Sequence, residues 1–241
     1  MSWYKENYDY TFHNPVLRRH YMIGVIKKPI QKEKVLSQAQ LISFLDAIDN
    51  QLFQDLAIIQ FFCASRFGET AGIQVKNIDL ENKKLLIKET VIEDQSRKFL
   101  ELKLYPKNGY SRAVSIGYGM FQDAITRRLM APECMNGFLF TQRGRPLSYR
   151  SVQYHYEKAL KKAGLYPEFS GTHFLRYTMA TESRRLMNSL DAAQAITGHH
   201  SVKLAEQYAE LPSALQSQTI RTVGENLRQS WESYDSQALR L

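Results

Sequence analysis

The chain has 241 residues, of which 44% are hydrophobic and 23% charged, the size and composition of one large or two small globular domains. Its formal net charge of +8 at pH 7 favours a polyanionic partner, most simply nucleic acid, although many basic proteins bind none. The sequence has no apolar run that could span a membrane, no secretory signal, and two widely separated cysteines without zinc-ligand spacing, so we expect a cytoplasmic protein without a metal site.

Residues 1–35 are predicted to form an extended basic arm or linker, because they mix aromatic with basic residues and contain two prolines. They are too few and too irregular for a domain of their own, and a solvated tail is the alternative. The basic residues that could lie along a polyanion are Arg18, Arg19, Lys27, Lys28, Lys32 and Lys34.

Helical spacing of apolar residues follows the arm. Ser37 is predicted to cap a helix in SQAQLISFLDAI, and QLFQDLAIIQFFCA predicts a second, mostly buried helix that holds Cys63 as a reduced thiol. We expect Gly68 to break this helix and a short helix to restart within SRFGETAGI.

Three strand-like segments come next: KKLLIKETVI, FLELKLY and SRAVSI, which are rich in branched residues and partly alternating. The Asn-Gly pair of PKNGY, between the last two, predicts a tight turn that joins them. A small antiparallel sheet therefore interrupts a helical chain, and the expected fold class is mainly α with a small antiparallel β-sheet (α+β).

Helices resume in YGMFQDAITRRLM and SYRSVQYHYEKALKKAG, with a loop in NGFLFTQRGRPLS between them. Thr172 is predicted to cap HFLRYTMATESRRLM, and Ser189 to cap LDAAQAI, which stops at Gly198. A last helix is expected over much of 213–232, packed on its own domain or docked on a neighbouring protomer. Its apolar stripe consists of Leu215, Ile220, Val223 and Leu227.

Three short segments carry charged or titratable side chains that could bind an anion or transfer a proton. Glu69 follows Arg66 by three residues and can orient its guanidinium, although a surface ion pair is the plainer reading. Lys107 lies at the predicted turn and projects into solvent or a ligand groove. His173 and Arg176 share one face at a helix start, where phosphate binds well, unless this face is simply solvated.

A fourth segment is GHHSVKLAEQY. His199 and Tyr208 are nine residues apart, which on one continuous helix places them on opposite faces. Gly198 as a helix end and Ser201 as a new cap would separate them onto two helices, so that Tyr208 turns back toward His199. A capped loop with a packing tyrosine is the alternative.

Read in order, these segments resemble the tyrosine recombinase (phage integrase) family over roughly residues 36–215. SRFGETAGIQVKNIDL looks like its first-arginine box, KNGYSRAVSI its lysine hairpin, HFLRYTMAT its HxLRH box, and GHHSVKLAEQY its final box. Tyr177 and Thr197 depart from the usual histidine and leucine. The resemblance implies the catalytic-domain fold of that family, with a catalytic domain over 36–212 and a helical tail over 213–241.

The resemblance also implies chemistry on DNA through a 3′-phosphotyrosyl intermediate, without metal, ATP or another cofactor. The implied catalytic residues are Arg66, Lys107, His173, Arg176, His199 and Tyr208. Tyr208 would attack the phosphorus, and Arg66 and Arg176 would hold the non-bridging oxygens with donors that stay charged. Glu69 would hold Arg66 in place.

The remaining roles concern protons. Lys107 would protonate the leaving 5′-oxygen, and His173 would accept the proton of the attacking tyrosine. The Gly-His pattern selects His199 over His200 as an extra donor to the phosphate. Arg112, in the strand after the lysine, is expected to contact DNA together with the basic arm.

The function implied is that of an integrase-like site-specific recombinase of a mobile genetic element, nucleoid-associated in the cytoplasm. Double-stranded DNA would be the partner of a chain that is monomeric alone and tetrameric in the synapse, with accessory DNA-bending proteins left open. Two alternatives remain, a type IB topoisomerase-like enzyme and a non-catalytic DNA-binding regulator. The family's core-binding domain has no room in the residues before the catalytic pattern, so the chain is a catalytic fragment or a short member, with weak, salt-dependent DNA affinity.

Overall fold

The computed structural model describes residues 34–94, 99–104, 111–117, 119–132, 134, 137–187, 196–197 and 212–238. All of them belong to the second of two compact units, Lys34–Leu241, and the first unit, Met1–Glu33, lies outside the described residues. In chain order the elements are α3 (Gln38–Asp46), α4 (Gln51–Phe62), α5 (Phe67–Ala71), η1 (Val75–Asn77), β1 (Ile78–Asp79), β2 (Lys84–Ile87), β3 (Thr90–Glu93), β4 (Phe99–Lys103), β5 (Arg112–Ser115), α6 (Met120–Leu129), β6 (Thr141–Gln142), β7 (Arg145–Pro146), α7 (Tyr149–Lys162), α8 (His173–Met187) and α10 (Pro212–Ala238).

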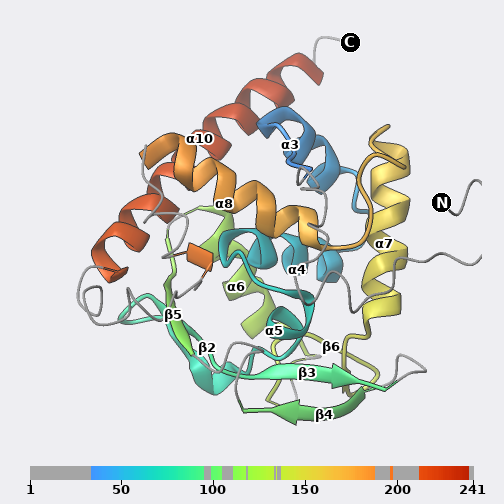
Figure 1. Ribbon diagram of the computed structural model, residues 1–241, viewed down its shortest axis with the longest axis vertical. Helices are drawn as coiled ribbons and strands as arrows, with labels where there is room; N and C mark the ends of the chain where they lie inside the picture. Colours follow the sequence, from blue (N-terminus) through green and yellow to red (C-terminus); the bar gives the residue numbers. More distant parts are fainter. Residues whose placement is uncertain are drawn as a thin grey trace, which may run out of the picture. The chain divides into compact units, whose positions relative to one another are not determined.

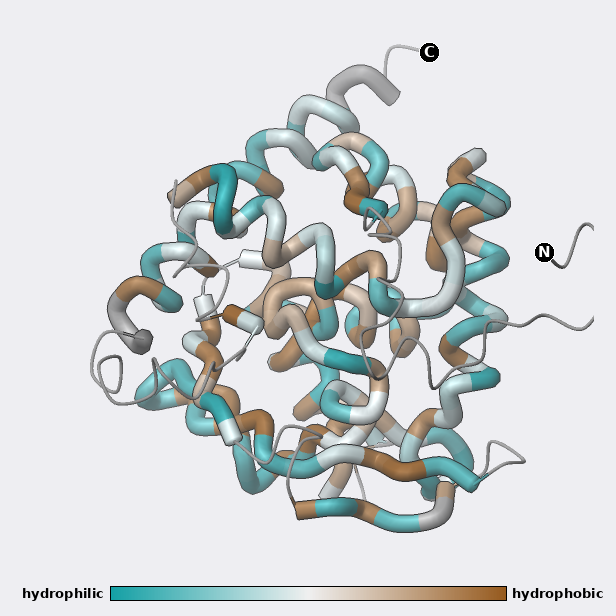
Figure 2. The backbone as a smooth tube through the Cα atoms, in the orientation of Figure 1, coloured by the Kyte–Doolittle hydropathy of each residue, from teal (hydrophilic) through white to brown (hydrophobic). Residues whose placement is uncertain are grey.

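Helix α4 forms the centre of the helical body, where α3, α5, α6, α7 and α8 all contact it (Figure 1). Most of its residues are buried, in keeping with its nearly continuous apolar sequence. Ser37 caps α3 as expected, in a reciprocal capping box with Gln40, and Asn50 caps α4. Helix α7, at the outside of the unit, is amphipathic: in Figure 2 it carries hydrophilic residues on its outer side and apolar residues on its inner side.

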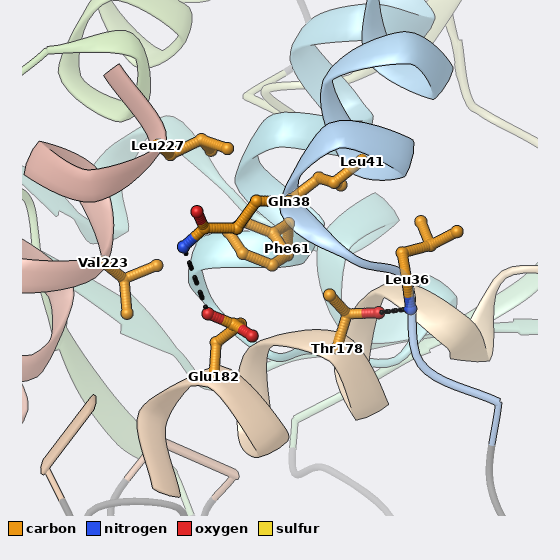
Figure 3. A pocket seen from close by; sticks show the side chains of 8 residues that line it. All are labelled: Leu36, Gln38, Leu41, Phe61, Thr178, Glu182, Val223 and Leu227. Atoms are coloured by element: carbon orange, nitrogen blue, oxygen red, sulfur yellow. Dashed lines mark hydrogen bonds between the residues drawn. The ribbon is translucent and has the colours of Figure 1, made fainter. Parts of the chain in front are cut away.

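Helix α10 packs on α3, α8 and β5 of its own unit. Ile220, Val223 and Leu227 of the predicted stripe are buried in the common core, whereas Leu215 is only half-buried. Figure 3 shows the seam between the three helices, where Gln38 of α3 points toward Glu182 of α8. The last helix is thus part of the compact unit Lys34–Leu241.

The described strands form three small sheets. β2 pairs with β5 beside β1, β3 pairs with β4, and β6 pairs with β7, all antiparallel. This confirms small antiparallel sheets but not the expected β4–β5 hairpin. Lys88 and Glu89 interrupt the run KKLLIKETVI and divide it into β2 and β3. The chain runs outward along β2 and β3 and back along β4 and β5, so β4 pairs with β3 and β5 pairs with β2.

The break after α4 also differs from the expected one. The helix ends at Phe62, and Ala64 has a positive φ of 43°, whereas Gly68 lies inside α5. A Cβ on Gly68 would lie 2.8 Å from Thr90 Oγ1 and from the Val91 carbonyl oxygen. Gly68 is therefore needed for the close packing of α5 on β3 and does not end a helix. None of the helices in the described ranges has the length and hydropathy to cross a bilayer.

Candidate active site

The site is built around the turn between α4 and α5. Ala64 takes the left-handed conformation there, and Arg66 occupies the N-cap position of α5 with an extended backbone. The Arg66 main-chain N–H donates to Glu69 Oε2 at 3.3 Å, and its Nη1 donates to Glu69 Oε1 at 2.9 Å. The guanidinium is thus fixed by its own helix start while 28% of the side chain stays exposed.

Glu69 is shared between two arginines. Its side chain is 1% exposed, and Oε2 accepts a hydrogen bond from Arg112 Nη2 at 3.0 Å, opposite the contact with Arg66. Burial alone would raise the pKa of this carboxyl, but the charge and hydrogen bond of Arg112 and the hydrogen bond of Arg66 outweigh burial and hold the pKa below its usual value. Glu69 therefore stays ionised at neutral pH.

Arg112, predicted to contact DNA, binds groups of the protein itself in this structure. Its side chain is 11% exposed, and besides Glu69 its Nη2 donates to the carbonyl oxygen of Cys63 at 3.2 Å. The Cys63 thiol is buried as predicted, and burial raises its pKa to about 12, so it is a protonated, unreactive group.

Arg176 binds main-chain oxygens of two distant segments. It comes from the start of α8, is 3% exposed, and donates from Nη1 to the Ala64 carbonyl and from Nη2 to the Thr197 carbonyl at 2.9 Å. Burial, followed by the charges of Arg112 and Arg66, lowers its pKa to about 10, which leaves it charged at neutral pH.

His173 is the first residue of α8 and is exposed. Partial burial, and then the charges of Arg66 and Arg176, lower the pKa of its imidazole below 6.5, against a weaker opposing effect of Glu69. At neutral pH the ring is therefore uncharged and can accept a proton. The preceding Thr172, expected as the cap, has no hydrogen-bond partner for its buried hydroxyl among the described residues.

The cluster of Arg66, Arg112, Arg176 and His173 thus has an excess of positive charge. Within the described part of the chain, Glu69 is the carboxylate that binds these guanidinium groups, and it serves two of them. Such a cluster can hold an anion next to a neutral base. The described residues contain no group of three or more histidine, cysteine or acidic side chains suited to a metal ion.

Half of the predicted catalytic set can be placed. Arg66, His173 and Arg176 come together around Glu69, while Lys107, His199 and Tyr208 lie outside the described residues. Of the basic arm, Lys34 is described and exposed. The other expected DNA contacts of the arm lie outside the described residues: Arg18, Arg19, Lys27, Lys28 and Lys32.

One residue of the site escaped the sequence reasoning. Gln60 is completely buried in α4, and its amide bonds to the main chain of Ser65 and Thr172, the residues before Arg66 and His173. Its signal in the sequence is one amide inside the otherwise apolar run IIQFFCA.

Comparisons with known proteins fit this geometry. Residues 34–214 match the model of the phage integrase family. Tyrosine recombinase XerH of Campylobacter jejuni is 26% identical over 190 residues, covering 75% of this chain and 49% of that protein. Tyrosine recombinase XerC of Shewanella amazonensis is 27% identical over 173 residues, covering 68% of this chain and 51% of that protein. The chain spans about half the length of these curated relatives.

Solved structures share the fold. The Tn1549 transposon integrase, in complex with a circular intermediate DNA, superposes with a TM-score of 0.60 at 21% identity, over 79% of this chain and 66% of that one. The XerH recombinase bound to a palindromic difH substrate gives a TM-score of 0.56 at 22% identity, over 79% and 54% of the two chains. The expected fold, mainly helical with small antiparallel sheets, is thereby confirmed.

Proposed function

The chain belongs to the phage integrase family, and on this premise we propose that it is the catalytic part of a tyrosine-type site-specific DNA recombinase. The observation that carries the proposal is the cluster around Glu69, where Arg66 and Arg176 stand beside the uncharged His173. This combination suits a phosphodiester that gains negative charge while a neighbouring hydroxyl loses its proton.

In the proposed reaction, the Tyr208 oxygen attacks the phosphorus of the scissile phosphodiester. A phosphotyrosyl bond forms at the 3′ side, and the bond to the 5′-oxygen breaks. His173 accepts the phenolic proton, and Lys107 donates a proton to the departing 5′-oxygen. The phosphotyrosyl bond keeps the energy of the broken ester, so a second 5′-hydroxyl can reverse the step on another strand without ATP.

Fixed positive charge stabilises the transition state in this proposal. Arg66 and Arg176, with His199 as a further donor, hold the non-bridging oxygens, which is the role that a metal ion has in many other phosphoryl-transfer enzymes. Arg112 keeps Glu69 ionised and in place and thereby orients Arg66. We infer that Arg112 acts from behind the site and does not contact DNA itself.

Double-stranded DNA is the proposed substrate. The solved relatives named above are complexes with DNA, and the net charge of +8 suits a phosphate backbone. We further propose that the chain is monomeric alone and forms a tetrameric synapse on its site, with the exposed Lys34 and the basic residues before it along the backbone.

A suicide substrate tests the function. The chain is incubated with nicked duplexes from the flanks of its own gene, in EDTA and without nucleotide, and the covalently linked residue is mapped by mass spectrometry. We expect an adduct at Tyr208, none for Tyr208→Phe, and an unchanged yield for the control Tyr154→Phe, whose side chain is exposed on α7.

Three outcomes would contradict the proposal. Failure to form an adduct on DNA that the protein binds would point to a regulator that keeps the fold without the chemistry. Adduct formation that EDTA abolishes would point to a metal-dependent site. Relaxation of plasmids of unrelated sequence, without strand exchange, would instead favour a topoisomerase-like activity.

A further inference from the structure

A buried amide connects the two halves of the candidate site. Gln60 is 0% exposed near the end of α4. Its Nε2 lies 3.4 Å from the carbonyl oxygen of Ser65 and 3.4 Å from that of Thr172, and its Oε1 lies 3.1 Å from the Tyr156 hydroxyl. A polar side chain in an apolar core destabilises the fold unless it is bonded, so these contacts account for its presence.

The bonding leaves one orientation for this amide. Both main-chain partners are carbonyl oxygens that only accept, so the Gln60 NH₂ group must face them. Its oxygen then faces Tyr156, whose hydroxyl donates. Burial raises the pKa of Tyr156 well above its usual value, so this hydroxyl keeps its proton. The Tyr156 ring is itself held edge-on by Phe44, at a centroid distance of 5.4 Å.

The two carbonyls that Gln60 binds belong to the residues directly before Arg66 and His173. Ser65 and Thr172 thus lie at the two segments that supply the positive groups and the base. Ser65 and its neighbours are further fixed by the hydrogen bond between its hydroxyl and Thr70 at 2.6 Å. The Thr172 hydroxyl has no partner among the described residues, so its carbonyl, which accepts from Gln60, is the group through which a side-chain hydrogen bond fixes the residue before His173.

We propose that Gln60, oriented by Tyr156, is a positioning residue that sets the separation between the Arg66 turn and the start of α8. It acts through Ser65 and Thr172 and touches neither DNA nor the reacting atoms. Its effect on strand cleavage rests on the proposed function, whereas its effect on the surroundings of His173 does not.

Two variants test this proposal in the full chain. Tyr156→Phe keeps the ring and removes the hydroxyl, and Gln60→Met keeps the length and removes the amide. At saturating suicide DNA we expect each to lower the rate of covalent cleavage about tenfold or more, because small misplacements of catalytic groups have large effects on rate. The dissociation constant for DNA should stay within about threefold, since no phosphate contact is removed.

A titration of His173 by NMR provides a second readout that loss of stability alone would not move. In the native chain this ring lies near Arg66 and Glu69 of the α5 segment and Arg176 of its own helix, and partial burial, followed by the two arginine charges, lowers its pKa below 6.5. A loosened helix start gives the ring more solvent, so the pKa of His173 should rise toward 6.5 in both variants. His173→Gln identifies the signal among the six histidines.

The control is Tyr154→Phe, two residues before Tyr156 on the same helix and 65% exposed. Combining Gln60→Met with Tyr156→Phe should slow cleavage no further than Gln60→Met alone, because Tyr156 acts through Gln60. The proposal is overturned if Tyr156→Phe folds and matches the control in both rate and titration, even where Gln60→Met fails to fold.

The two proposals fail separately. If the native chain forms no adduct but the His173 titration moves in the variants, the positioning role stands and the recombinase activity does not. If the native chain cleaves DNA and both readouts are unchanged in the variants, the activity stands and the positioning role is wrong.

Discussion

Arg176 donates a hydrogen bond from Nη2 to the carbonyl oxygen of Thr197 at 2.9 Å, which ties the start of α8 to the residue directly before Gly198. The same guanidinium also binds the Ala64 carbonyl in the turn after α4. One buried cation therefore joins three segments that are distant in the sequence. The phosphate-binding role that we propose for it would depend on these main-chain carbonyls to hold the guanidinium in place.

Replacing this guanidinium with a point charge should disable the site. Arg176→Lys cannot bind both carbonyls in a fork and still present a donor to phosphate. We expect covalent cleavage of suicide DNA to fall by about 100-fold or more. Arg184→Lys, on the same helix but exposed, is the control and should cleave normally. Equal rates for the two variants would remove Arg176 from the proposed mechanism.

Neutralising Glu69 should destabilise the fold. In Glu69→Gln one carboxylate oxygen becomes an NH₂ donor that faces an arginine donor, and two buried or half-buried guanidinium groups lose their shared anion. We expect a loss of about 2–4 kcal/mol in the free energy of unfolding at pH 7, measured with urea. Glu225→Gln, which breaks the exposed pair with Arg221, should change it by less than about 1 kcal/mol.

The effect of Glu69 has a defined pH dependence. Because the folded pKa of this carboxyl is lowered, its ionised form stabilises the native state above the usual pKa of 4.5, and this stabilisation is lost as the pH falls through the folded pKa. The stability difference between the native chain and Glu69→Gln should therefore be constant near neutral pH and shrink below 4.5. A difference that grows on acidification would contradict the lowered pKa.

The proton-accepting role that we propose for His173 predicts how the cleavage rate depends on pH. Its lowered pKa means that the ring is already neutral above 6.5, so cleavage at subsaturating DNA should reach a plateau there and fall at lower pH. His173→Gln should lose this acidic limb together with most of the rate. His155→Gln removes another histidine with a lowered pKa, stacked on Phe53, and should keep the native profile.

Replacing Ala64 with glycine should relieve backbone strain and stabilise the folded state. Its φ of 43° is unfavourable for any residue with a Cβ, and Ala64→Gly removes that conflict. We expect a gain of up to about 1 kcal/mol in thermal or urea unfolding, with cleavage preserved because the carbonyl that Arg176 binds is unchanged. Ala57→Gly, in the interior of α4, is the matched control and should lose about 1 kcal/mol. A loss of stability in Ala64→Gly would show that the turn is unstrained.

Much of the fold and half of the site were predictable because they depend on short-range signals. The Ser37 cap, the apolar α4 and the Arg66–Glu69 pair each arise from residues within a few positions of one another. His173 and Arg176 both lie in the first turn of α8, so their closeness was predictable as well.

The errors concern long-range contacts. The partner of β5 depends on where the chain bends at Lys88 and Glu89, and that bend has no strong local signal. The bond between Arg112 and Glu69 was also not predicted, because it joins β5 to α5 across 43 residues of sequence. The role of Gln60 required knowing that Thr172, 112 residues away, lies beside it.

The docking of α10 in its own unit has a practical consequence for biochemical work. Val223 and Leu227 line the seam with α3 and α8, and Ile220 is buried in the same core. A chain shortened before Pro212 would therefore expose an apolar surface to the solvent. Such a truncation would be prone to precipitation, and any failure to recombine would then reflect poor solubility. Dissecting the tail calls for polar substitutions on its outer side, with the inner side left intact.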